Sequence, residues 1–338
     1  MKTKTLYLIL ALIAFLVGIG SALFGAVSIS LEEMAAAIQK WISQTDDLSL
    51  NEQIFLDIRL PRAVLGLIVG GSLAVGGVLM QGLFLNPIVE PGLVGTSSGA
   101  AFGAALYFTL GTSIDFHTGE FTLPIAASIG GAIATFLVYF LAESPTRKTS
   151  IVTLLLVGIA INALFFSGVG FLSYIARDPQ ARSITFWNLG PLSGANWISV
   201  AICSLVSLSC IVLGLRNAKQ LNTLMLGESE AGNLGIKVKT LKIRMLTINV
   251  ILISVCTAFT GVIAFVGLIV PHFLRIISGS DSRQLIIGSF MMGAILLGLA
   301  DILARLLLAP AELPIGIVTT MVGVPVFIYL LRKHNNYF

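Results

Sequence analysis

Charged residues, histidine and cysteine are scarce in this chain of 338 residues. Only 11% of the residues are charged, 56% are hydrophobic, and the mean hydropathy is +0.98. These values exclude a soluble globular domain, in which about 25% of residues are charged. The net charge of +4 comes without a basic stripe interleaved with aromatic residues, so nucleic acid is not an expected partner.

The few reactive side chains form no catalytic or metal-binding pattern. Cys203, Cys210 and Cys256 lie in apolar runs without the spacing of metal ligands, and we interpret them as small buried hydrophobic residues. No GxxxxGK[ST] loop occurs, so this chain is not expected to bind ATP itself. With no nucleophile and base pair in view, we expect neither an enzyme nor a metal or cofactor site in this subunit.

Long apolar runs are what the sequence has instead. A membrane-spanning helix needs roughly 20 apolar residues, and such runs recur along the whole chain. They predict an all-α polytopic membrane protein with a single transmembrane domain, 1–338. The first run continues to Val27, beyond the roughly 7–15 residues of a signal-peptide core, and is interpreted as a retained span. About ten spans are predicted, near 5–28, 60–83, 93–111, 122–142, 151–174, 195–215, 243–261, 263–278, 284–308 and 314–331.

The charges between the spans predict the orientation. The segment 29–57 is acidic, with Lys40 as its one basic residue, whereas the segment 216–242 is rich in lysine. Cytoplasmic loops of membrane proteins carry an excess of Lys and Arg. With an even number of spans, this bias places both termini in the cytoplasm and 29–57 outside.

The segment 59–103 combines a glycine-rich apolar helix with two polar ends. Small residues spaced by four allow helix backbones to approach closely within a bilayer. The segment opens with Arg59-Leu60-Pro61-Arg62 and closes its first helix with Gln81, Asn86-Pro87 and Glu90-Pro91-Gly92. The second apolar helix then follows with Gly95, Gly99 and Gly103. Prolines and polar residues at this end predict non-helical backbone that is buried in protein or faces water.

The segment 216–242 has a different pattern. Leu221, Leu224 and Met225 form a short apolar face, and Gly227 and Gly235 separate two predicted short helices. Such helices, with apolar and acidic faces, are suited to the groove of a partner protein. An interfacial helix lying on the bilayer is the alternative.

Five stretches together resemble the permease subunit of bacterial iron-chelate and vitamin B12 ABC importers, the type II importer family. In chain order they are Arg59 to Arg62, Gln81 to Gly92, Leu226 to Gly235, Gly267 to Arg275, and Ala300 to Gly316. The resemblance covers essentially the whole chain. It implies a homodimer of ten-span subunits in the bacterial inner membrane, with two cytoplasmic ATP-binding subunits that hold ATP and magnesium and a periplasmic substrate-binding protein above.

The resemblance also implies roles for individual residues. Arg59, Arg62 and Arg305 match positions where the family presents arginines to acidic residues of the binding protein, and an exposed guanidinium cluster would steer such a partner. As an alternative, Arg59 and Arg62 are anchors whose side chains extend along the apolar surface to the membrane interface. For Arg305 the alternative is an ion pair with Asp301, four residues earlier. The ATPase-coupling segment comprises Leu226, Gly227, Glu228, Ala231, Leu234 and Gly235.

A cytoplasmic gate is implied at Asn86 and Ile88, with Ile151 and Val152 as the second constriction. The family often has small hydroxyl residues where Ile151 and Val152 stand, and an ordinary connecting turn at Asn86 is the alternative. The segment 182–196 resembles the family's short outer helix, and its residues are most similar to those of the haem-importing branch. Haem or a ferric siderophore is therefore the favoured cargo, with cobalamin and molybdate as alternatives.

A stand-alone carrier or proton relay is the competing class of function. Ionisable groups inside a span favour such a relay, and Asp301 is the main candidate. Asn162 and Asn249 are isolated polar residues for which we predict hydrogen bonds between helices. A secondary transporter would offer several ionisable groups at midplane depth, and the sequence nearly lacks them.

Overall fold

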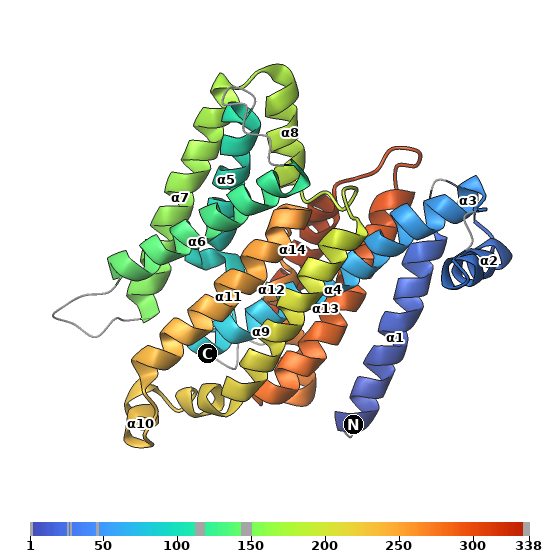
Figure 1. The fold of residues 1–338 in the computed structure, drawn as a ribbon. Helices are drawn as coiled ribbons and strands as arrows, with labels where there is room; N and C mark the ends of the chain where they lie inside the picture. Colours follow the sequence, from blue (N-terminus) through green and yellow to red (C-terminus); the bar gives the residue numbers. More distant parts are fainter. Residues whose placement is uncertain are drawn as a thin grey trace.

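The computed structural model describes residues 3–25, 27, 29–44, 47–111, 119–142 and 151–333, without the side chains of 3, 120, 151, 331 and 333. Within these residues every regular element is helical, and the helices run side by side as a bundle (Figure 1). The α-helices are α1 Thr3–Leu23, α2 Leu31–Ile42, α3 Leu50–Gln53, α4 Leu60–Phe84, α5 Thr96–Leu110, α6 Thr122–Ala142, α7 Ile151–Ile175, α8 Asp178–Asn188, α9 Trp197–Leu224, α10 Glu228–Asn233, α11 Val238–Thr260, α12 Val266–Ser278, α13 Ser282–Leu306 and α14 Ile315–Lys333. A π-helical turn η1 (Ile54–Arg59) leads into α4, and the 3-10 turns η2 (Pro91–Val94) and η3 (Gly119–Phe121) precede α5 and α6.

All ten predicted spans are apolar helices in the structure. In the described part of the chain, seven helical segments are long and apolar enough to cross a membrane, while α12 and α14 are shorter apolar helices. With only 15 residues, α5 is also shorter than a full crossing. The largest boundary error concerns α9, which continues to Leu224, nine residues past the predicted end at 215.

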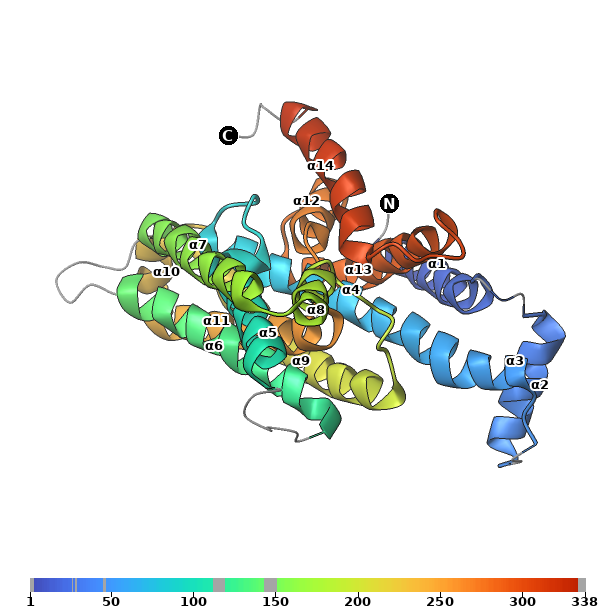
Figure 2. The same ribbon diagram turned by 90° about the horizontal axis from the view of Figure 1, so that it is seen from above.

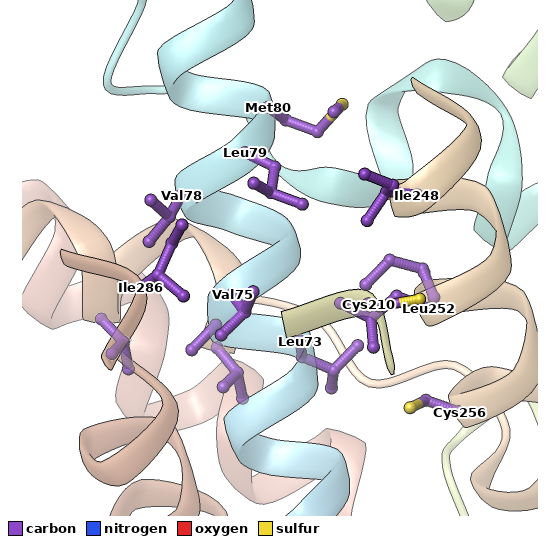
Figure 3. Close-up of a cluster of buried hydrophobic side chains, with 14 of the residues drawn as sticks. Leu73, Val75, Val78, Leu79, Met80, Cys210, Ile248, Leu252, Cys256 and Ile286 are labelled. Carbon is purple, nitrogen blue, oxygen red and sulfur yellow. The ribbon is translucent and has the colours of Figure 1, made fainter. Parts of the chain in front are cut away.

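The central element of the bundle is α4. Seen from above, it lies between α9 and α11 on one side and α13 on the other (Figure 2). Its side chains Leu73, Val75 and Leu79 belong to the main buried apolar cluster together with Leu252 of α11 and Ile286 of α13 (Figure 3). A helix that is apolar on all sides is typical of a fully surrounded position in a membrane bundle.

Glycine allows α4 to approach its neighbours at backbone distance. A methyl group built on Gly70 would overlap the carbonyl oxygen of Gly293 in α13, and one on Gly77 would overlap that of Gly267 in α12. The pair Gly99 and Gly130 creates the same close contact between α5 and α6. The predicted role of the small residues in helix packing is therefore confirmed for these positions.

The two ends of the bundle differ. One end carries Arg59, Arg62 and Arg305 together with the C-terminus of α1, and we call it the arginine end. The opposite end carries α10, with the C-terminus of α9 joined to the N-terminus of α13 by a hydrogen bond from Asn222 to Asp281 of 2.7 Å. The acidic segment that includes α2 lies at the arginine end (Figure 1).

Candidate functional site

The arginine end is organised around one buried carboxylate. Asp301 of α13 is 1% exposed and accepts a hydrogen bond from Arg62 Nε at 3.0 Å. It also pairs with Arg305 Nη2 at 2.8 Å and accepts a hydrogen bond from the hydroxyl of Ser21 at 3.1 Å. The predicted pairing of Arg305 with Asp301 is thus present, and Asp301 joins α1, α4 and α13.

Two of the arginines also complete the C-terminal end of α1. The last carbonyl groups of a helix have no partner within the helix. Arg59 donates to the carbonyl oxygens of Leu23, at 2.7 Å, and Val27. Arg305 donates to those of Ser21, at 2.7 Å, and Phe24. These guanidinium groups therefore cap α1 where it would otherwise leave carbonyls unpaired.

The expectation of an exposed guanidinium cluster is wrong for this structure. Arg59, Arg62 and Arg305 are 6%, 8% and 5% exposed. Their burial follows from their partners, because the α1 carbonyls and Asp301 need donors where water is largely absent. One partner remains accessible: Glu312, with a side chain 44% exposed, pairs with Arg62 Nη1 at 2.7 Å.

A second polar region lies where two irregular segments meet inside the bundle. The segment after α4, residues 85–95, contacts the segment 261–265 that precedes α12: a carboxylate oxygen of Glu90 accepts a hydrogen bond from the backbone N–H of Phe265 at 2.9 Å. Phe265 has a positive φ of 69°. Gln81 of α4 donates to the carbonyl of Leu268 at 3.2 Å. We call this region the inner junction.

Two side-chain amides complete the inner junction. Asn249 of α11 donates to the carbonyl of Pro91 at 3.2 Å, and Asn162 of α7 donates to that of Leu93 at 3.0 Å. The hydrogen bonds predicted for these residues exist, but their acceptors are backbone carbonyls of η2. Irregular backbone within a membrane bundle needs such internal partners. The sequence motif Glu90-Pro91-Gly92 gave no indication that the Glu90 carboxylate accepts a hydrogen bond at the N-terminus of α12.

The predicted gate residues lie on the segment that leads from α4 to the inner junction. The Asn86 side chain accepts a hydrogen bond from the backbone N–H of Ile88 at 2.9 Å, and Leu85 before it has a positive φ of 50°. Ile88 is 37% exposed and Val152, at the start of α7, is 64% exposed. The side chain of Ile151 lies outside the described residues. Of the four predicted gate residues, Ile88 and Val152 therefore present exposed apolar side chains that can face a passage or a partner.

The predicted coupling segment contains one separate short helix, not two. Leu221 and Leu224 belong to the last turn of α9 and are fully buried, because α9 continues past the predicted break. After Gly227, with a φ of 104°, α10 begins at Glu228, whose carboxylate pairs with Lys242 of α11 at 2.6 Å.

Exposure divides the coupling residues into two kinds. Leu226 and Leu234 flank α10 and are 65% and 64% exposed, whereas Ala231 is fully buried. Gly235 has a positive φ of 85°, which suits the turn into α11. The flanking leucines thus form an apolar surface at the α10 end, while Ala231 attaches the helix to the bundle. Among the described residues no cluster of three potential metal ligands occurs.

The sequence comparisons show the family. The model of the FecCD transport family matches residues 10–333. The chain belongs to this family. It is 41% identical over 326 residues to the hemin transport system permease protein HmuU of Yersinia pestis, covering 96% of this chain and 95% of that protein. It is 36% identical over 289 residues to the vitamin B12 import system permease protein BtuC of Vibrio cholerae, covering 85% and 86% of the two chains.

A solved structure supports the same assignment. A metal-chelate type ABC transporter in an inward-facing conformation superposes with a TM-score of 0.85 at 30% identity, covering 98% of this chain and 99% of that chain. The predicted resemblance and the predicted type II importer permease fold are therefore confirmed. As a FecCD family member the chain is a multi-pass membrane permease with a role in transport.

Proposed function

We propose that this chain is the permease subunit of an importer that carries an iron chelate, with haem as the favoured cargo, across the inner membrane. The observation that carries the proposal is the 41% identity to a hemin permease along 96% of the chain. Vitamin B12 is the second candidate, because the BtuC protein matches at 36% identity. A homodimer would enclose the passage, and both termini would lie in the cytoplasm.

ATP hydrolysis in a partner subunit would supply the energy. We propose that the ATPase binds the apolar surface of Leu226 and Leu234, with α10 as the coupling helix. The Glu228–Lys242 pair would hold α10 against α11, so that movement of the ATPase reaches the bundle. The passage would narrow at Asn86, Ile88, Ile151 and Val152.

A substrate-binding protein would dock at the arginine end. The acidic partner predicted for Arg59, Arg62 and Arg305 would first meet Glu312, since this carboxylate occupies Arg62 at the surface. Docking at Arg62 would therefore exchange an internal carboxylate for one from the partner. The remaining contacts of the arginines with α1 and Asp301 would stay in place and position the surface.

The test is cargo-stimulated ATP hydrolysis and uptake by the complex of this permease, an ATPase and a binding protein encoded beside it, reconstituted in proteoliposomes. Haem, a ferric siderophore and cobalamin are compared as cargo, and haem is expected to give the largest stimulation. Replacing both Leu226 and Leu234 with serine should abolish co-purification with the ATPase, while serine at the exposed Leu205, on the flank of α9, should not. Uptake that persists without ATPase and binding protein would support a stand-alone carrier instead.

A further inference from the structure

Helix α2 is held at the edge of the arginine end by several polar contacts. It lies outside α1 and beside α3 at the periphery of the bundle (Figure 2). Its N-terminus carries a capping box formed by Ser30 and Glu33. Glu33 also accepts a hydrogen bond from Asn51 at 2.7 Å, and Lys40 pairs with Glu52 at 2.9 Å. The Asn51 amide and the backbone N–H of Ser30 lower the pKa of Glu33.

One face of α2 is apolar and has no protein partner among the described residues. Leu31, Ile38 and Ile42 are 67%, 41% and 74% exposed. Their spacing of seven and four residues aligns them on one narrow stripe of the helix. Met34 and Ala37, on the adjacent face, are buried against the protein. The stripe is therefore a second apolar surface, separate from the one that attaches α2 to the bundle.

The depth of α2 is given by a tryptophan pair. Trp41 stacks on Trp197, with ring centroids 6.1 Å apart and planes 7° from parallel. Trp197 is the first residue of the spanning helix α9, and its indole N–H donates to the carbonyl of Leu56 at 3.1 Å. Tryptophan at the end of a span sits at the membrane–water interface. The Trp41 contact thus places the C-terminal end of α2 at this level.

The neighbouring surface of α1 is apolar and exposed. Along α1, Leu8, Leu12 and Phe15 are 72%, 59% and 66% exposed, as expected for a span at the periphery of a membrane bundle. A helix that lies beside such a span, at interface depth, borders on lipid. The opposite flank of α2 carries exposed Glu32 and Gln39, which remain in water when the stripe faces the bilayer.

We propose that α2 is an interfacial helix that inserts Leu31, Ile38 and Ile42 into the bilayer at the arginine end. Interfacial helices bind through buried apolar area and through attraction of basic residues to anionic lipids. The polar side of α2 has Glu32 and Glu33, and Lys40 is its one basic residue. Attachment therefore depends on apolar insertion and is independent of the lipid charge.

The test is a nitroxide scan of the full-length permease in nanodiscs. Single cysteines replace Leu31, Ile38 and Ile42 in a variant without the native cysteines, with Glu32 and Gln39 as matched controls on the same helix. The spectra measure collisions with oxygen, which concentrates in lipid, and with a water-soluble nickel chelate. We expect the ratio of oxygen to nickel accessibility to be several-fold higher at the stripe, and equal in neutral phosphatidylcholine and in anionic phosphatidylglycerol.

Equal nickel accessibility at the stripe and at the two controls would overturn the proposal. So would stripe labels that are free in nanodiscs and become immobilised only when a binding protein is added, because the stripe would then be a protein-docking surface. If labelled variants fail to fold, brominated lipids provide a second measurement: quenching in the native protein should exceed quenching in the Trp41→Phe variant. The same quenching in both proteins would also contradict the proposal.

Discussion

Substitution of Asp301 by asparagine tests whether the arginine end stabilises the bundle. The variant keeps the size of the side chain but removes the negative charge shared by Arg62 and Arg305. An asparagine oxygen can still accept from one guanidinium group, and its NH₂ group then faces the other. One buried guanidinium group therefore loses its counter-ion, while Glu312 continues to pair with Arg62.

The expected loss is large because the site is closed to water. Asp301 is 1% exposed and Arg305 is 5% exposed. Removal of one member of a buried ion pair costs about 3–5 kcal/mol, since the remaining charge is uncompensated. We expect the Asp301→Asn variant to lose about 3 kcal/mol or more of unfolding free energy. Asp57→Asn is the control, because Asp57 is exposed and such surface changes stay within about 0.5 kcal/mol.

The measurement is reversible unfolding in mixed micelles of dodecyl maltoside and sodium dodecyl sulfate, followed by tryptophan fluorescence. If the unfolding free energy of the variant and of the native protein depends equally steeply on the fraction of sodium dodecyl sulfate, the two proteins undergo the same transition. A difference below about 1 kcal/mol between Asp301→Asn and the native protein would refute the reasoning. It would mean that water or a rearranged Glu312 replaces the lost carboxylate at little cost.

Three further predictions concern the helix contact, the acidic helix and the docking surface. Gly77→Ala should destabilise the bundle by about 1–3 kcal/mol in the same assay, because its methyl group overlaps the carbonyl of Gly267. Glu33, with its pKa held below the ordinary value of about 4.5, stabilises α2 above that pH, and this contribution is lost as the pH falls through the lower folded-state pKa; the protection factors of the α2 amides, which correct hydrogen exchange for its intrinsic pH dependence, should therefore fall on acidification. Glu312→Gln should strengthen binding of the substrate-binding protein severalfold in biolayer interferometry, because it frees Arg62.

Matched controls separate these effects from general damage. Gly170→Ala, at a helical glycine with open space around it, should not destabilise the protein. Glu33→Gln should show lower protection factors in α2 at neutral pH and little further change in them with acid, whereas Glu32→Gln should retain the native pH profile of protection. Equal affinities for Glu312→Gln and the native permease would argue against carboxylate exchange at Arg62.

The helices and their close contacts could be predicted from the sequence because each depends on a local pattern of residues. Ten apolar runs became ten helices, and the spaced glycines became close contacts such as the one between Gly70 and Gly293. Hydrogen bonds between helices were predicted for Asn162 and Asn249, and both amides do bond to another segment, the backbone carbonyls of η2. Each inference needed only the chemistry of a membrane interior, where apolar runs span and polar groups find partners.

The errors concern contacts between distant segments. The end of α9 was placed too early because Leu221 and Leu224 were assigned to the apolar face of a separate short helix, whereas both lie in the last turn of α9 and are buried. No local pattern could show that Arg59 would bind carbonyls more than 30 residues away, at the end of α1.

The arginine end gives Arg59, Arg62 and Arg305 a structural role beside the recognition role proposed for them. An arginine that projected freely could be replaced at small cost in stability, and its loss would affect only the partner. Here Arg59 and Arg305 cap α1, so their removal would disturb the bundle as well as any docking surface. Glu312 is different, because its side chain is 44% exposed and its ion pair within the described part of the chain is with Arg62. Docking is therefore best examined through Glu312, where a change in partner affinity can be read without loss of the fold.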